Sequence, residues 1–390
     1  MNEVKALHIA SFHGNIGDNA NHNGFRRKLK KSLEVNIKFD EIEMREFYQS
    51  WNLRDFNSDD FIDLCNNYDL IIIGGGNFFE LKWDYSYTGT TVNISHDTLR
   101  KINTPIFFHG VGCDIAKGTS SSAITKFDNF LEVLTNSNKY LVSVRNDGSN
   151  NTIKKLYGSK YNGKVHKVAD GAFFLETTQH EFPELNHNLK SIGINVVSDM
   201  KDIRFDTTKK NGIEYDEFIE GFAKYLNQFL LENQEYQLIF FPHIYSDLLS
   251  IYDLISRIDD KFRRTRVIVA PCITGEGSED YIFSLYKECD LVLGMRFHSN
   301  VCSIAQNIPT IALSSYKKIY DLYSELHLLE RVIEVNKEGF LDKLIVQVDY
   351  TLNNLEDIKK HYQIVNMNIE KESVKFYSKI KAWALENSII

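Results

Sequence analysis

Short apolar runs alternate with amphipathic stretches along most of the 390-residue chain. Residues 6–12, 69–73 and 105–109 are apolar runs of strand length, and a glycine-rich turn follows each of them. Residues 120–136 and 214–231 instead repeat their apolar positions at the period of a helix. Strands that alternate with helices favour parallel sheets, because parallel strands need a crossover connection. The pattern therefore predicts an α/β protein.

A polar stretch over residues 177–189 interrupts this alternation. It contains Pro183 and has no helical or strand period, so we place a domain boundary there. A chain of this length is sufficient for two domains of ordinary size. We therefore expect one domain over residues 1–180, a second over 190–350, and a charged helical tail over 351–390.

Composition and charge narrow the classes of function. A formal charge of −8 at pH 7 argues against a general nucleic-acid binder. The five cysteines include no Cys-x-x-Cys pair, so we expect neither a zinc site nor a disulfide framework, and a reducing cytoplasm fits. No stretch approaches the ~20 apolar residues that span a bilayer. We expect a protein of the cytoplasm, and contact with the inner face of the membrane stays open.

The stretch from residue 289 to 313 carries the first candidate site. It predicts a buried strand over 291–293, a turn, and a helix over about 298–306. Ligands of open α/β sheets bind beyond the carboxyl ends of the strands, which is where Arg296 and His298 lie. A cation, an imidazole and the N–H groups of a helix N-terminus indicate an anion site, with phosphate as the first candidate. The alternative is a surface ion pair of Arg296 and a capping role for His298.

A glycine-rich loop follows the first predicted strand. Residues 13–19 read His-Gly-Asn-Ile-Gly-Asp-Asn, and we expect a helix with a basic run over about 20–33. Such a loop lets a ligand approach the backbone closely, although the spacing is not the G-x-G-x-x-G of dinucleotide sites. Asp18 and Asn19 are candidates for ligand contact and for helix capping. The basic run is either a solvated face or a contact for the phosphates of a lipid-linked acceptor or an anionic membrane.

Further candidate loops follow other predicted strands. Gly74-Gly75-Gly76-Asn77 comes directly after residues 69–73, where three glycines permit close approach or a sharp turn. Arg145 directly follows the strand predicted over 140–144, a suitable place for a phosphate or carboxylate clamp.

These motifs resemble those of the polysaccharide pyruvyl transferase family. The resemblance covers most of the chain and is strongest at residues 69–77 and 289–318. It is weaker at three positions. His109 stands where the family usually has Gln, Asn146 follows Arg145 where the family has Asp, and Gly171 replaces the Pro of an Asp-Pro-Ala motif.

The resemblance implies two Rossmann-like domains facing a cleft, similar to the glycosyltransferase B architecture, with the tail packing back on the first domain. Members of the family move a pyruvyl group from phosphoenolpyruvate onto two hydroxyls of a sugar and form a ketal. The implied partners are phosphoenolpyruvate as co-substrate and a sugar acceptor, lipid-linked or polymeric, in cell-surface polysaccharide synthesis. We expect no cofactor and no metal, and a homo-oligomer stays open.

The resemblance and the chemistry of the side chains assign roles to individual residues. His298 is the first candidate for proton transfer, and Asp18 is the first candidate for the base that activates the attacking hydroxyl, with His243 as the second. Lys318 fits the lysine of the family, although Lys317 stays an alternative. We expect the donor to be bound by Arg145, Arg296, Ser299 and Lys318, and the acceptor by Asn15, Gly17, Asn19, Gly75, Gly76 and Asn77.

Two other classes of function stay open. A glycosyltransferase with the same two-domain architecture would use Arg296 and the helix N-terminus to hold the diphosphate of a nucleotide sugar. A non-catalytic sugar-binding or assembly subunit would keep its affinity for carbohydrate after His298→Ala. Phosphate release from phosphoenolpyruvate distinguishes the ketal-forming transferase from both.

Overall fold

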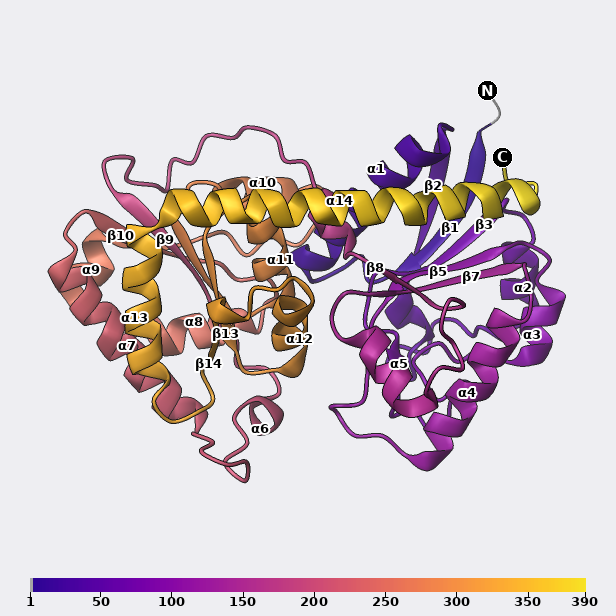
Figure 1. The fold of residues 1–390 in the computed structure, drawn as a ribbon, viewed down its shortest axis with the longest axis horizontal. Helices are drawn as coiled ribbons and strands as arrows, with labels where there is room; N and C mark the ends of the chain where they lie inside the picture. Colours follow the sequence, from indigo (N-terminus) through magenta and orange to yellow (C-terminus); the bar gives the residue numbers. More distant parts are fainter. Residues whose placement is uncertain (1–2) are drawn as a thin grey trace. The chain divides into compact units, whose positions relative to one another are not determined.

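The computed structural model describes residues 3–390, which form two units, each built on a six-stranded sheet (Figure 1). The first unit comprises the chain up to Phe12, Asn21–Phe174 and Asn368–Ile390. The second comprises His13–Ala20 and Leu175–Met367. We predicted domains that are continuous in sequence, with limits 1–180, 190–350 and 351–390. In the structure, each unit also includes a segment from a distant part of the sequence.

The sheet of the first unit has the strand order β2-β1-β3-β5-β7-β8, and its neighbouring strands are parallel. Its strands are β1 Val4–Ala10, β2 Ile37–Glu43, β3 Leu70–Gly74, β5 Ile106–Val111, β7 Tyr140–Arg145 and β8 His166–Val168. A separate parallel pair consists of β4 Phe79–Glu80 and β6 Cys113–Asp114, which the hydrophobic pattern does not predict because each strand has only two residues.

Helices cover both faces of this sheet. Along β3, Ile71 and Ile73 face a core shared with α2, α3 and α4, while Leu70 and Ile72 face a core shared with α1 and α14. This alternation follows from the two-residue period of a strand. The helices are α1 Ile16–Leu33, α2 Asp59–Cys65, α3 His96–Lys101, α4 Ser121–Thr135 and α5 Ser149–Tyr157, with the 3-10 turns η1 Met44–Phe47 and η2 Gly171–Phe174.

The sheet of the second unit has the order β11-β10-β9-β12-β13-β14, again with parallel neighbours. Successive strands run outward in one direction from β9 and in the other from β12. The topological switch point of the sheet therefore lies between these two strands, where open α/β sheets place their ligands. The strands are β9 Lys190–Asn195, β10 Tyr236–Phe240, β11 Val267–Val269, β12 Leu291–Gly294, β13 Thr310–Ser314 and β14 Val332–Glu334.

The core of the second unit joins the inner residues of this sheet to α7, α8 and α13. The remaining helices include α11, which follows β12 directly and contacts β12 and β13. The helices are α6 Lys201–Arg204, α7 Tyr215–Glu232, α8 Asp247–Ile255, α9 Asp260–Thr265, α10 Ser278–Tyr286, α11 Phe297–Ala305, α12 Lys317–Glu325, α13 Phe340–Asn353 and α14 Leu355–Glu386, with the 3-10 turn η3 Leu329–Arg331.

The first helix begins earlier than the glycine-rich loop predicts. Helix α1 starts at Ile16 rather than near residue 20. The Asn15 side chain caps it, because Asn15 Oδ1 accepts a hydrogen bond from the Gly17 N–H at 3.0 Å. Asp18 therefore lies in the first turn of the helix and does not cap it.

The last helix contributes to both units. In its first part, Tyr362 Oη donates a hydrogen bond to the Thr310 carbonyl of β13 at 3.1 Å. In its last part, Trp383 Nε1 donates to the Asn138 carbonyl at 2.7 Å, and Phe376 packs in the first unit's core. Among residues 3–390, no helix combines the length and the apolar character that crossing a bilayer demands.

Replacing Trp383 with alanine tests this contribution. The indole is 7% exposed in the first unit's core, so we expect Trp383→Ala to lower the free energy of unfolding by about 3–5 kcal/mol. Leu385→Ala is the matched control, because Leu385 lies on the same helix and is 58% exposed. Urea denaturation measures both variants, and equal destabilisation by the two would contradict a structural role for Trp383.

Candidate functional site

The candidate site begins where β12 passes into α11. Arg296 has an extended backbone and immediately precedes the first helical residue, so His298 and Ser299 lie buried in the first turn of α11. Gly294 makes the turn possible. A Cβ at that position would lie 2.8 Å from Ser299 Oγ and 3.0 Å from Asn300 Nδ2, so a larger residue would require these side chains to shift. The strand, the turn and the helix occur as the sequence predicts.

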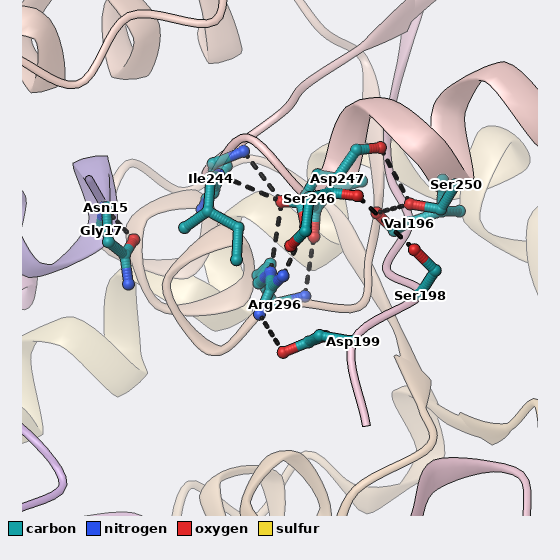
Figure 2. A network of polar contacts seen from close by, with 12 residues as sticks. Asn15, Gly17, Val196, Ser198, Asp199, Ile244, Ser246, Asp247, Ser250 and Arg296 are labelled. Carbon is teal, nitrogen blue, oxygen red and sulfur yellow. Dashed lines mark hydrogen bonds and ion pairs between the residues drawn. The ribbon is translucent and has the colours of Figure 1, made fainter. Parts of the chain in front are cut away.

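Arg296 is held by two carboxylates (Figure 2). Its Nε donates to Asp247 Oδ2 at 3.2 Å and its Nη2 to Asp247 Oδ1, so this pair is bidentate. Its Nη1 donates to Asp199 Oδ2 at 3.1 Å. Burial lowers the pKa of Arg296, but Asp247 and then Asp199 outweigh burial, and the net pKa is raised. The guanidinium is therefore a charged, positioned group.

Asp247 and Asn195 together link three strand ends to Arg296. Its carboxylate is fully buried and also accepts from the backbone N–H of His243 at 3.0 Å and of Ile244 at 3.4 Å, both of which follow β10. Asn195, the last residue of β9, accepts from the Arg296 N–H through Oδ1 at 2.7 Å. The carboxyl ends of β9, β10 and β12 are thus joined through one hydrogen-bonded network.

His298 lies against the segment His13–Ala20, which belongs to the same unit. His298 Nδ1 is 4.0 Å from Asp18 Oδ1, and Asn15 Nδ2 donates to Asp18 Oδ2 at 3.1 Å. A Cβ on Gly17 would lie 2.4 Å from His298 Nδ1, so only glycine at this position lets the imidazole approach the helix. From the sequence, we expected this loop on the acceptor side of the first domain. The structure places it beside His298 in the second unit.

A chain of buried hydrogen bonds holds the first turn of α11 through Ser299. Tyr286 Oη donates to Ser299 Oγ at 3.1 Å, and His243 Nε2 lies 2.9 Å from Tyr286 Oη. Burial, followed by the charges of Arg296 and His298, lowers the pKa of His243 well below its usual value. His243 is therefore neutral and holds Tyr286, while its carbonyl accepts from the Ile16 N–H at 3.3 Å.

Arg145 lies in the first unit and is also paired with carboxylates. Its Nε donates to Asp147 Oδ2 at 2.7 Å and its Nη1 to Asp170 Oδ2 at 3.3 Å. Asn21 Nδ2 donates to the same Asp170 oxygen at 2.6 Å. The Asn146 side chain accepts from the Asp170 N–H at 2.9 Å. Asp147, which is displaced by one position from the family pattern, thus supplies a carboxylate to Arg145.

Packing accounts for the glycines after β3. Gly75 has a φ of +80°, and a Cβ on it would lie 2.6 Å from the His22 ring. Gly76 accepts from the Gly112 N–H at 2.8 Å, and Asn77 is half-buried in the same loop. These contacts lie within the first unit and do not by themselves indicate an acceptor.

The two candidate lysines open α12. Lys317 is exposed and forms an ion pair with Asp321 one turn along the helix. Lys318 is half-buried at the second position of the helix, directly after the loop at the end of β13.

The structure divides the predicted site residues between the units. Asp18, Arg296, His298 and Ser299 lie together in the second unit, where Asn19 Nδ2 also donates to the Thr274 carbonyl at 3.4 Å. Sequence reasoning did not assign roles to Asp199, Arg204 and Asp247, although Asp247 lies four residues after His243 at the end of a predicted strand. No group of three His, Cys, Asp or Glu side chains in the described part of the chain is arranged to bind a metal ion.

Comparison with known proteins bears on this site. The family model described as polysaccharide pyruvyl transferase matches residues 15–316, which include the loops around Asp18, Arg145 and Arg296. No curated protein matches the chain.

Solved structures resemble the fold. A Listeria monocytogenes protein assigned as a UDP-N-acetylglucosamine 2-epimerase has a TM-score of 0.57 at 9% identity, over 93% of this chain and 91% of that one. A glycosyltransferase from Rickettsia africae has a TM-score of 0.55 at 10% identity, over 98% of each chain. The N-terminal domain of Candida albicans trehalose-6-phosphate phosphatase has a TM-score of 0.53 at 12% identity, over 97% of this chain and 99% of that one. They confirm the prediction of an α/β protein with two Rossmann-like domains of the glycosyltransferase B type.

A substitution at Gly17 tests the approach of His298 to α1. We expect Gly17→Ala to displace the imidazole and to lower the free energy of unfolding by about 1–3 kcal/mol, because its Cβ overlaps Nδ1. The NMR signals of the His298 ring and urea denaturation measure the two effects. Gly275→Ala is the control, since its Cβ would have 3.8 Å to its nearest neighbour. An unmoved imidazole in Gly17→Ala would show that the contact is not tight.

Buried histidines predict acid sensitivity. Burial lowers the pKa of His109 to about 3, against an opposing effect of Asp170, and lowers the pKa values of His8 and His243 well below the usual 6.5. The unfolded chain binds protons near pH 6.5 and the folded chain does not, so stability falls as the pH drops from 6.5 toward 3. For His109 this loss approaches about 1.4 kcal/mol per pH unit within that window.

The substitution His109→Gln removes one of these groups. We expect urea denaturation at a series of pH values to give a shallower loss of stability below pH 6.5 than in the parent. His187→Gln, at an exposed position, should leave the slope unchanged. A slope that His109→Gln does not alter would mean that His109 is protonated in the folded chain.

Proposed function

The chain belongs to the polysaccharide pyruvyl transferase family, and from that premise we propose that it transfers a pyruvyl group from phosphoenolpyruvate to two hydroxyls of a sugar. The acceptor is a cell-surface polysaccharide or its lipid-linked precursor, and the products are a cyclic ketal and phosphate. The observation that carries this proposal is the cluster of Arg296, His298 and Asp18 at the carboxyl edge of the second sheet, inside the matched region.

The proposed reaction balances without a cofactor. A proton adds to the methylene carbon of the enol, and one sugar hydroxyl forms a C–O bond to C2. The bond from C2 to the phosphate oxygen breaks, and the second hydroxyl attacks C2 to close the ring. The two hydroxyl protons end on the new methyl group and on phosphate.

His298 suits the proton-transfer step of this reaction. Its Nδ1 faces Asp18 and Gly17, which fixes the orientation of the ring and leaves Nε2 as the nitrogen on the other side. A positioned imidazole contributes typically 10²–10⁴-fold to a rate. Asp18 Oδ1 lies 4.0 Å from His298 Nδ1, and in this proposal Asp18 is the base that takes the proton of the attacking hydroxyl.

Donor and acceptor contacts extend the proposal to other residues. In this proposal Arg296, Ser299 and Lys318 of the second unit bind the donor, and Arg145 stays a separate donor-binding prediction within the first unit. The acceptor would meet the loop that contains Asn15, Gly17 and Asn19, while Gly75, Gly76 and Asn77 stay a separate acceptor-binding prediction within the first unit. The first loop is supported by its contact with His298.

Substitution of His298 tests the proposal. The assay measures phosphate release from phosphoenolpyruvate with a panel of nitrophenyl and lipid-linked sugars. We expect His298→Ala to lower kcat/KM by about 10²–10⁴-fold, because the proton-transfer group is lost. Lys287→Ala, at an exposed position directly after α10, should keep the parent activity. Activity of His298→Ala within a few-fold of the parent would reject the assignment.

The same assay separates the alternatives. A nucleotide-sugar glycosyltransferase would bind a nucleoside diphosphate and release no phosphate from phosphoenolpyruvate. A non-catalytic subunit would bind sugar in His298→Ala as in the parent. Arg296→Ala is less suitable as a first variant, because removing one partner of a buried ion pair costs about 3–5 kcal/mol and would leave Asp247 unpaired.

A further inference from the structure

The switch point of the second sheet holds a second buried guanidinium. Arg204 ends α6, on the segment that follows β9, and its side chain is 6% exposed. Its Nε donates to the Asp199 carbonyl at 3.0 Å and lies 3.4 Å from Asp199 Oδ1. Its Nη1 donates to Ser315 Oγ at 3.2 Å, so Arg204 reaches the end of β13. Neither composition nor motif spacing singles out this residue.

Asp199 lies between the two arginines. One carboxylate oxygen contacts Arg296 Nη1 at 3.1 Å and the other contacts Arg204 Nε at 3.4 Å. Burial raises the pKa of Asp199, but the two guanidinium groups outweigh burial, so the carboxyl has a lowered pKa and is ionised. A single carboxylate thus bridges two cations at the place where this class of sheet binds ligands.

The two carboxylates around Arg296 differ in what else holds them. Asp247 is fully buried and also accepts from two backbone N–H groups, which would lose their partner if it moved. The Asp199 side chain is 27% exposed, and its carboxylate contacts the two guanidinium groups and its own backbone N–H. Its loop precedes Met200, which has a φ of +54°. Asp199 is therefore the counterion that a ligand can replace at lower cost.

The formal charges of the four side chains indicate the class of ligand. Two arginines and two aspartates leave the cluster formally neutral. When Asp199 leaves, Arg204 and Arg296 face Asp247 alone, and the cluster carries one positive charge. A compact anionic group with oxygens on one face, a carboxylate or a phosphoryl group, supplies the missing negative charge and matches the fork geometry of guanidinium groups.

We propose that Arg204 and Arg296 form one two-armed anion site, in which the Asp199 carboxylate occupies the place of an anionic group of the ligand. Arg204 is then a further ligand-binding residue, and Asp199 competes with the ligand. The identification of that ligand as phosphoenolpyruvate rests on the proposed function; the anion site itself rests on the contacts of these three residues.

Calorimetric titration of the full chain with inorganic phosphate, pyruvate and phosphoenolpyruvate at low salt tests the site. We expect Asp199→Asn to bind its preferred anion about tenfold more tightly than the parent, because the competing charge is removed. Tighter phosphate binding identifies the phosphoryl group as the occupant, and tighter pyruvate binding identifies the carboxylate. Asp206→Asn is the control, since Asp206 lies on the same segment but pairs with Thr208 and Lys209. Its affinities should equal those of the parent.

A double-mutant cycle isolates Arg204. In the Asp199→Asn background, we expect Arg204→Met to weaken anion binding about tenfold or more. Arg204→Lys should restore part of the lost affinity, because it keeps the positive charge. If Arg204 were purely structural, anion affinity would not follow the order Arg, Lys, Met. In the unmodified chain, NMR titration with phosphate or pyruvate should shift the Nε signals of both Arg204 and Arg296. This measurement keeps the test valid if a variant fails to fold.

The outcomes separate this inference from the proposed function. Two results would overturn the two-armed site, even if the parent releases phosphate from phosphoenolpyruvate. One is that Asp199→Asn binds all three anions with the affinity of the parent. The other is that no anion shifts the NMR signals of Arg204. Tighter binding of phosphate or pyruvate by Asp199→Asn supports the site. If that occurs while phosphoenolpyruvate binds no better than either simple anion and is not turned over, the site stands and the proposed function fails.

Discussion

The buried ion pair of Arg296 and Asp247 is the interaction on which the candidate site depends. It is bidentate, and its carboxylate also satisfies two backbone N–H groups after β10. Buried pairs of this kind give little net stability, because desolvation offsets their attraction. Their effect here is positional: the pair fixes where β12 ends and α11 begins, and therefore where His298 lies. The position of His298 therefore depends on the ion pair of Arg296 and Asp247.

The alternation of apolar and amphipathic segments was enough to predict both parallel sheets, because a buried parallel strand needs a continuous apolar run and its crossover needs a helix. The strand, turn and helix around Arg296 were predicted for the same local reason. Contacts between distant segments were not predictable. The sequence gives no sign that Gly17 lies against His298 or that Asp199 bridges two arginines, because such pairings depend on how loops meet in three dimensions.

Packing, backbone conformation or ion pairs within the first unit account for several motif residues, independently of any functional role. Gly75 is required by its backbone conformation and by the His22 ring, and Arg145 is bonded to two aspartates. The departure at His109 is accommodated by stacking on Phe25 at 3.7 Å. In each case the sequence pattern marked a position where the backbone or a charge is constrained. Whether a substrate also uses that position is a separate question, which binding measurements address.

The shared last helix has a consequence for biosynthesis. Residues 368–390 supply core side chains to the first unit, although that unit's sheet is complete in sequence two hundred residues earlier. The amino-terminal part therefore leaves the ribosome long before its final packing partner is translated. Until then the apolar side chains of β1, β3 and β5 in this core are covered by α1 but lack the last helix. A shortened chain that stops before residue 368 would keep the side of this core that the helix covers permanently open to aggregation.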